Sequence, residues 1–92
     1  MLGQRINELR KARGWSQVDL AKRLGITKQT VSNWENDNIL PSIEMLIRLS
    51  ETFGVSTDYI LGLDDTPRLD IKGLPDSVIG HISLLIDDYK NK

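Results

Sequence analysis

The chain has 92 residues, no cysteine and a formal net charge of −1. This length suits one small domain with a modest core, and the absence of cysteine excludes disulfides and thiolate metal sites. No apolar run approaches the roughly eighteen residues of a membrane span, and the first residues lack the pattern of a secretory signal. We therefore expect a protein of the reducing cytoplasm that makes no contact with a membrane.

Charge is distributed unevenly along the chain. Residues 1–30 hold seven basic and two acidic side chains, whereas residues 31–92 hold five basic and eleven acidic ones. Opposed halves of this kind suggest a basic face for phosphate and an acidic body away from it. For any single lysine or arginine, a solvated helix surface is an equally good interpretation.

The first two predicted elements are helices separated by a glycine. The first helix is expected over residues 2–13, ending at Gly14. Its buried stripe would consist of Leu2, Ile6 and Leu9. Ser16 can cap the second helix because its hydroxyl accepts an orphan N–H, and Asp19 three residues later makes a variant of the capping box. Gly25 suits the left-handed position that ends this helix.

The helix after Gly25 carries apolar residues on one side only. Thr27 can cap it, and Val31 and Trp34, three residues apart, face inward, which favours core packing over base stacking for Trp34. The outer side is left with Lys28, Gln29, Ser32 and Asn33. Side chains of these types hydrogen-bond DNA base edges and phosphates. Because a helix-turn-helix places its second helix in the major groove, the pattern indicates a DNA-binding regulator.

Two further helices are predicted before residue 63. Ser42 would cap the first of them, and Gly54 would close it. Its apolar residues follow a 3.6-residue period and are Ile43, Leu46, Ile47, Leu49 and Phe53. Ser56 would cap a last short helix that Gly62 ends. Five helices without a strand make a small all-α bundle.

The tail begins with a predicted linker or short extended arm over residues 64–75. Residues 69–72 alternate apolar and polar, which allows a short strand, and a helix is expected over residues 76–92 with Asp76 or Ser77 as its cap. The apolar stripe of this helix consists of Val78, Ile79, Ile82, Leu85, Ile86 and Tyr89. The stripe can fold back on the domain or pair with its counterpart in a second subunit. We favour dimerisation, since a protein that reads one half-site gains affinity and specificity by binding two.

Four motifs stand at fixed spacing between residues 4 and 63: Gly14-Trp15-Ser16-Gln17, Gly25-Ile26-Thr27, Val31-Ser32-Asn33-Trp34-Glu35-Asn36 and Asp58-Tyr59-Ile60-Leu61-Gly62. With these motifs, residues 4–63 resemble the helix-turn-helix of the Cro/C1-type (XRE) family, the fold of small phage repressors. The resemblance implies a five-helix, lambda-repressor-like DNA-binding domain over residues 1–63, followed by the arm and the additional amphipathic helix. Asp37 stands where the family often has glycine, so Asn or Asp must adopt a left-handed conformation in this turn, which both tolerate.

The resemblance also implies roles for individual residues. Arg10 and Glu35 are expected to form a structural ion pair, with direct phosphate contact by Arg10 as the alternative. The residues expected at base edges are Thr27, Lys28, Gln29, Ser32 and Asn33. The residues expected at phosphates are Ser16, Gln17, Asn36 and Asn38. Gln17 would also brace Gln29, and exposure without any partner is the plainer alternative for each polar residue.

Enzymatic function is not expected. His81 is the only histidine, and no cysteine nucleophile, Walker or dinucleotide glycine pattern, or zinc-ligand cluster is present, so we predict no cofactor and no metal. One remaining function is a transcriptional regulator of double-stranded DNA, a repressor that binds a palindromic operator as a homodimer. The other is a protein-binding module, antitoxin- or antirepressor-like, whose C-terminal helix grips a partner protein. The polar outer side of the recognition helix favours the first.

Overall fold

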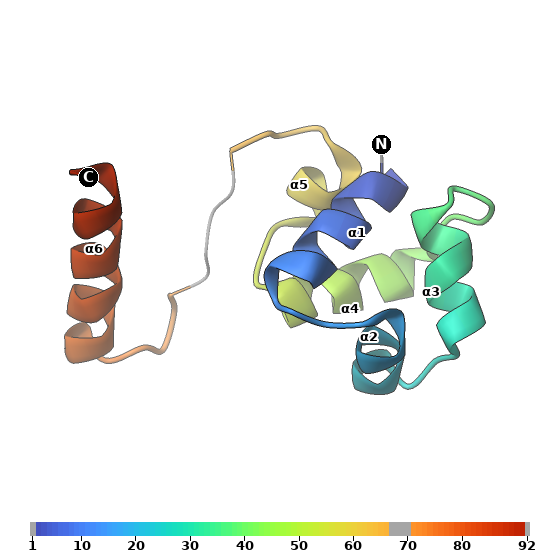
Figure 1. The fold of residues 1–92 in the computed structure, drawn as a ribbon, viewed down its shortest axis with the longest axis horizontal. Helices are drawn as coiled ribbons and strands as arrows, with labels where there is room; N and C mark the ends of the chain where they lie inside the picture. Colours follow the sequence, from blue (N-terminus) through green and yellow to red (C-terminus); the bar gives the residue numbers. More distant parts are fainter. Residues whose placement is uncertain (1, 67–70, 92) are drawn as a thin grey trace.

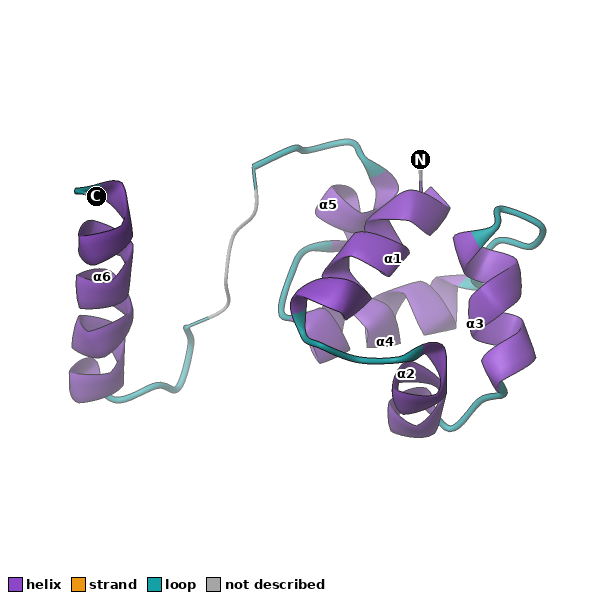
Figure 2. Cartoon of the chain, viewed as in Figure 1, coloured by secondary structure: helices purple, strands orange, loops and turns teal. Residues whose placement is uncertain are grey.

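The computed structural model describes residues 2–66 and 71–91, and all regular structure in these ranges is helical (Figures 1 and 2). The helices are α1 (Leu2–Ala12), α2 (Gln17–Leu24), α3 (Lys28–Glu35), α4 (Ile43–Phe53), α5 (Thr57–Leu61) and α6 (Asp76–Lys90). The predicted all-α fold class is thus confirmed. None of the helices described is long and apolar enough to span a membrane.

Capping hydrogen bonds determine where the helices of the body, α1–α5, begin. Ser16 Oγ accepts from the Asp19 N–H at 3.0 Å, and Asp19 Oδ2 accepts from the Ser16 N–H at 2.8 Å, which completes the predicted capping box of α2. Side-chain hydroxyls also cap α3, α4 and α5, where the N-cap residues are Thr27, Ser42 and Ser56. Each hydroxyl satisfies an N–H that has no partner inside its helix.

Two turns depend on a residue with positive φ. Gly25 ends α2 with φ +69°, a conformation that glycine adopts without steric cost. Asp37, in the turn after α3, has φ +58°, and it is the one residue other than glycine with positive φ in the part of the chain described. This confirms the left-handed conformation predicted for the turn.

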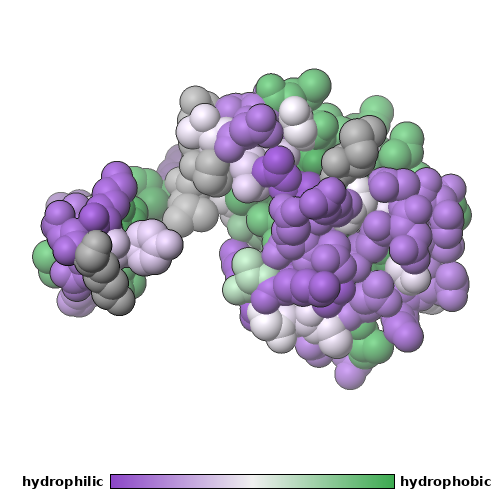
Figure 3. All heavy atoms as spheres, turned by 45° about the horizontal axis from the view of Figure 1, so that its top comes forward, coloured by the Kyte–Doolittle hydropathy of each residue, from purple (hydrophilic) through white to green (hydrophobic). Residues whose placement is uncertain are grey.

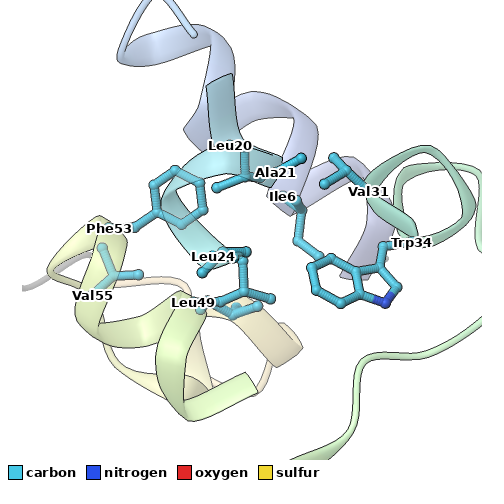
Figure 4. Close-up of a cluster of buried hydrophobic side chains, with 10 residues drawn as sticks. Ile6, Leu20, Ala21, Leu24, Val31, Trp34, Leu49, Phe53 and Val55 are labelled. Atoms are coloured by element: carbon cyan, nitrogen blue, oxygen red, sulfur yellow. The ribbon is translucent and has the colours of Figure 1, made fainter. Parts of the chain in front are cut away.

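The five helices of the body share one hydrophobic core (Figure 4). Its buried members are Ile6, Leu20, Ala21, Leu24, Val31, Trp34, Leu49, Phe53, Val55 and Ile60. Trp34 is 3% exposed, as expected for a core residue, and Trp15 lies at the edge with its ring centroid 5.7 Å from that of Phe53. Since every member precedes residue 61 and each large side chain contributes about 1.5–3 kcal/mol on burial, the body holds the stabilising core without α6.

The outer side of α4 differs from the prediction. Ile43 and Ile47 are 80% and 47% exposed, so their predicted place on the buried stripe is wrong. The inward direction of α4 is set by Leu49 and Phe53, which pack in the core, and the two isoleucines lie on a neighbouring side of the helix. With Ile39 and Leu40 just before α4, they form an exposed apolar set, the α4 patch (Ile39, Leu40, Ile43 and Ile47).

The segment before α6 contains a turn. Leu69 and Asp70, half of the predicted strand, lie outside the residues described, and Ile71 O accepts a turn hydrogen bond from the Leu74 N–H at 3.1 Å. Lys72 belongs to the same turn. The predicted strand is therefore not formed at residues 71 and 72.

α6 stands apart from the body in Figure 1. Pro75 occupies its N-cap position and no side chain caps it, so the cap predicted at Asp76 or Ser77 is wrong, because both residues already lie inside the helix. The most exposed members of its apolar stripe are Leu85 and Tyr89, at 69% and 79%. No helix among α1–α5 lies against α6 in Figure 1, so the alternative in which α6 folds back is not the observed one.

Candidate nucleic-acid interface

The outer side of α3 is polar. The residues on it are Thr27, Lys28, Gln29, Ser32 and Asn33, of which the first three are exposed and the last two half-buried. Gln29 Nε2 donates to Asn33 Oδ1 at 3.2 Å, and Ser32 Oγ accepts from Asn36 Nδ2 at 3.3 Å. Each of these amides and hydroxyls keeps further donor or acceptor capacity. This side of α3 can therefore hydrogen-bond an external partner.

Gln17, at the start of α2, does not reach Gln29. Its Nε2 donates to Glu35 Oε1 at 3.2 Å, so the brace predicted between the two glutamines is wrong. A carboxylate is a stronger acceptor than an amide oxygen, which explains why Gln17 turns toward Glu35. Gln29 bonds to Asn33, one helical turn further along α3, in place of Gln17.

The Glu35 carboxylate joins α1, α2 and α3. Its side chain is 4% exposed and accepts from Arg10 Nε at 2.7 Å, Arg10 Nη2 at 2.9 Å, Asn7 Nδ2 at 2.7 Å and Gln17 Nε2 at 3.2 Å. Arg10 Nη1 donates to the Trp15 carbonyl at 2.6 Å. We call Asn7, Arg10, Gln17 and Glu35 the Glu35 cluster. It fixes the C-terminal end of α3 against the other two helices.

The charges of this cluster stabilise each other. Burial raises the pKa of Glu35, but the hydrogen bonds from Arg10, Asn7 and Gln17 and the charge of Arg10 outweigh that effect, so its pKa lies below the usual range. The hydrogen bond to Glu35 raises the pKa of Arg10. With its side chain 9% exposed and all three nitrogens donating inside the body, Arg10 has the geometry of a structural residue and not of a phosphate contact.

Asn7 and Gly3 are positioning residues that sequence reasoning missed. Asn7 lies three residues before Arg10, a spacing that puts both on one side of α1 and so gave a usable signal. At Gly3, an added Cβ would lie 2.5 Å from the Trp34 carbonyl oxygen and 2.7 Å from that of Glu35. α1 therefore touches the end of α3 backbone to backbone. The sequence signal for this contact is only a glycine inside a helical stretch.

Several arginines of the basic N-terminal third are engaged within the body. Arg23 and Arg13 lie over the Trp15 ring, 4.0 and 5.3 Å from its centroid, and Arg5 lies 3.9 Å from the centroid of Tyr59. The exposed lysines of this third are Lys11, Lys22 and Lys28. The visible face of the body is largely hydrophilic (Figure 3). The positive charge of the N-terminal third is thus carried by these exposed lysines as well as by stacked arginines.

Residues 6–60 match the helix-turn-helix family model HTH_3. The chain belongs to the helix-turn-helix family of Cro/C1 (XRE) type. It is 39% identical over 67 residues to the transcriptional regulator ImmR of Bacillus subtilis, a match that covers 73% of this chain and 53% of ImmR. It is 37% identical over 71 residues to the repressor protein CI of Enterobacteria phage phi80, covering 77% of this chain and 30% of CI. This helix-turn-helix chain thus spans about half the length of ImmR and less of CI. These relatives are named as a regulator and a repressor, in line with the prediction that the chain is no enzyme.

Solved structures show the same fold. The P22 c2 repressor in complex with synthetic operator 9T is 34% identical, with a TM-score of 0.66, and the match covers 70% of this chain and 97% of that one. The regulator SinR in complex with DNA is 37% identical, with a TM-score of 0.62, and covers 66% and 98%. A chain of a SinR–SinI protein complex, 27% identical with a TM-score of 0.63, covers 100% of both. The body of this helix-turn-helix protein therefore has the fold of DNA-binding repressor domains.

Proposed function

We propose that this protein is a sequence-specific transcriptional repressor that inserts α3 into the major groove of double-stranded DNA in the cytoplasm. The observation that carries the proposal is the polar outer side of α3, which the Glu35 cluster holds in one orientation. The likeness to the P22 c2 repressor solved with an operator supports it. A rigid, polar helix face of this kind is what base-edge recognition requires.

The proposed contacts divide into base readout and phosphate binding. Lys28 and Gln29, on the first turn of α3, suit guanine O6 and N7 and adenine N6 and N7 respectively. The other proposed base-edge residues are Thr27, Ser32 and Asn33. The proposed phosphate contacts are Ser16, Gln17, Asn36 and Asn38. Because Gln17 Nε2 already donates to Glu35, Gln17 would contribute its second amide N–H and its backbone N–H at the start of α2.

Selection of binding sites from random duplex DNA with the purified protein tests this function. We expect a palindrome whose half-sites lie about 34 Å apart, one turn of the double helix. Selection of a single half-site would agree with a sequence-specific DNA-binding regulator but would contradict binding as a homodimer. No enrichment even at low salt, where phosphate contacts are strongest, would contradict DNA recognition.

Gln29→Ala tests the base-reading role of α3. We expect it to weaken binding to the selected site by about 1–3 kcal/mol and to relax specificity at one base pair. Gln4→Ala is a matched control, because Gln4 is an exposed glutamine on α1 that bonds only to Glu8 among the contacts described. Uniform weakening on all DNA sequences would instead assign Gln29 to phosphate binding.

We further propose that the protein is a homodimer held by the apolar stripe of α6. The support is that four members of the stripe, Val78, Leu85, Ile86 and Tyr89, are exposed, while Ile79 and Ile82 are half-buried. Leu85→Glu and Leu84→Glu form a matched pair: the two leucines are 69% and 60% exposed, but Leu84 lies about 100° further around the helix, outside the stripe. Light scattering should show a monomer for Leu85→Glu and a dimer for Leu84→Glu.

Truncation after Leu63 provides a second test of the dimer. The core of the body lies entirely before residue 61, so the shortened chain should fold. We expect it to be monomeric. If it stayed dimeric, the contact would lie on the body, where the α4 patch is one exposed apolar surface.

A second candidate function is binding of another protein through α6. The observation that favours it is the match of the whole chain, α6 included, to a chain of the SinR–SinI complex. In this function the stripe of α6 pairs with a helix of a different protein in place of its own copy. A monomeric full-length chain in solution would favour this candidate over the homodimer.

A further inference from the structure

Asp37 ties together two parts of the body that are distant in sequence. Its Oδ1 accepts a hydrogen bond of 3.0 Å from the N–H of Gly3, 34 positions earlier in the chain. Gly3 lies in the first turn of α1, where N–H groups have no acceptor within the helix. The Asp37 carboxylate therefore caps α1 from another element and sits near the positive end of the helix dipole.

The same residue fixes the turn that follows α3. Asp37 N–H donates to the Trp34 carbonyl at 3.1 Å, and Asn38 N–H donates to the Asn33 carbonyl at 2.9 Å, so the turn wraps over the end of the helix. A Cβ at Gly3 would lie 2.7 Å from Asp37 Oδ1, which leaves no room for a larger residue there. The turn is thus held on one side by α3 and on the other by α1.

We propose that Asp37 is a positioning residue for DNA binding, which by capping α1 holds Asn36 and Asn38 where they contact phosphates. The proposal rests on the proposed function, in which both asparagines bind the DNA backbone. A carboxylate beside phosphates is repelled by them, so direct DNA contact does not account for an aspartate at this position. The hydrogen bond to Gly3 does account for it.

Asp37→Gly and Asp37→Asn separate the hydrogen bond from the charge and from the backbone conformation. Both variants remove the negative charge of Asp37, so a difference in DNA affinity between them cannot come from that charge. Glycine and asparagine both tolerate the φ of +58° that Asp37 has in this turn. Asparagine keeps an oxygen that accepts from the Gly3 N–H, whereas glycine has none.

Three measurements, made well below the melting temperature of each full-length variant, test the role. They are amide hydrogen exchange at Gly3, affinity for the selected DNA site, and interference by phosphate ethylation. Relative to Asp37→Asn, we expect Asp37→Gly to exchange the Gly3 amide faster and to bind about fivefold more weakly, the fold-change of one lost cap. Ethylation interference should weaken only at the phosphates that face the turn after α3. A general loss of stability would not change the interference at these particular phosphates, so this result distinguishes a positioning role from a merely structural one.

Equal affinity and equal interference for the two variants would overturn the positioning role, whatever the exchange rates, and would leave the proposed function intact. A wild-type protein that prefers no duplex would overturn the proposed function and this role with it. The wild-type measurement alone separates these outcomes.

Discussion

Replacing Glu35 with glutamine should destabilise the body strongly, because it removes the one negative charge that compensates Arg10. The guanidinium would remain 9% exposed, with Nε and Nη2 facing a neutral amide in place of a carboxylate. Breaking a buried ion pair by removal of one partner costs about 3–5 kcal/mol. We expect the lower end of this range, since glutamine keeps one acceptor oxygen. For a domain of this size, about 3 kcal/mol lowers the Tm by at least roughly 12 °C.

Thermal denaturation followed by circular dichroism at pH 7 measures this shift. Arg10→Met and the double variant complete a double-mutant cycle. If the destabilisation comes from an orphaned charge, the double variant should be less destabilised than the sum of the two single variants. Additive effects, or a Tm shift of Glu35→Gln below about 4 °C, would refute this reasoning. Loss of DNA affinity in Arg10→Ala at an unchanged Tm would likewise contradict the structural role of Arg10.

Two further predictions concern pH and the turn between α2 and α3. Because the pKa of Glu35 is lowered in the folded state, its stabilisation is complete above the pKa of an unfolded glutamate, about 4.3, and is lost as the pH falls through the lower folded value. The Tm should therefore drop from about pH 5 downward, and Glu35→Gln should show a smaller drop over the same titration. Gly25→Ala should cost about 1–2 kcal/mol in urea denaturation, because the residue has φ +69° and an added Cβ would meet no atom within 4 Å, so only the backbone conformation is penalised; an unchanged stability would contradict the left-handed turn.

Local features of the fold were predictable from the sequence because they depend on residues a few positions apart. Ser16 and Asp19 form the expected capping box, Gly25 the expected left-handed end, and Val31 and Trp34 the inner side of α3. In each case the feature depends on residues that lie within one or two helical turns of each other. Spacing alone carries that information.

Features that depend on contacts between distant elements were not predictable in the same way. Periodicity placed Ile43 and Leu49 together on one stripe, but only the packing of α4 in the body decides that Leu49 is buried and Ile43 is 80% exposed. Gln17 bonds to Glu35, a partner 18 positions away, and not to Gln29, the predicted partner. The predicted side-chain cap of α6 is wrong for a local reason. Pro75 occupies the N-cap position with an extended backbone, and no side chain forms a capping hydrogen bond there.

The structure separates the residues that orient α3 from those proposed to read DNA. Glu35 and Trp34 bind the helix to the body through hydrogen bonds and core packing, and neither belongs to the outer side of α3. Lys28 and Gln29 are exposed, and neither is part of the core. Substitutions at Lys28 and Gln29 should therefore change which DNA sequence is bound at little cost in stability. Substitutions at Glu35 should lower stability and weaken binding to every sequence, because they loosen the whole recognition helix.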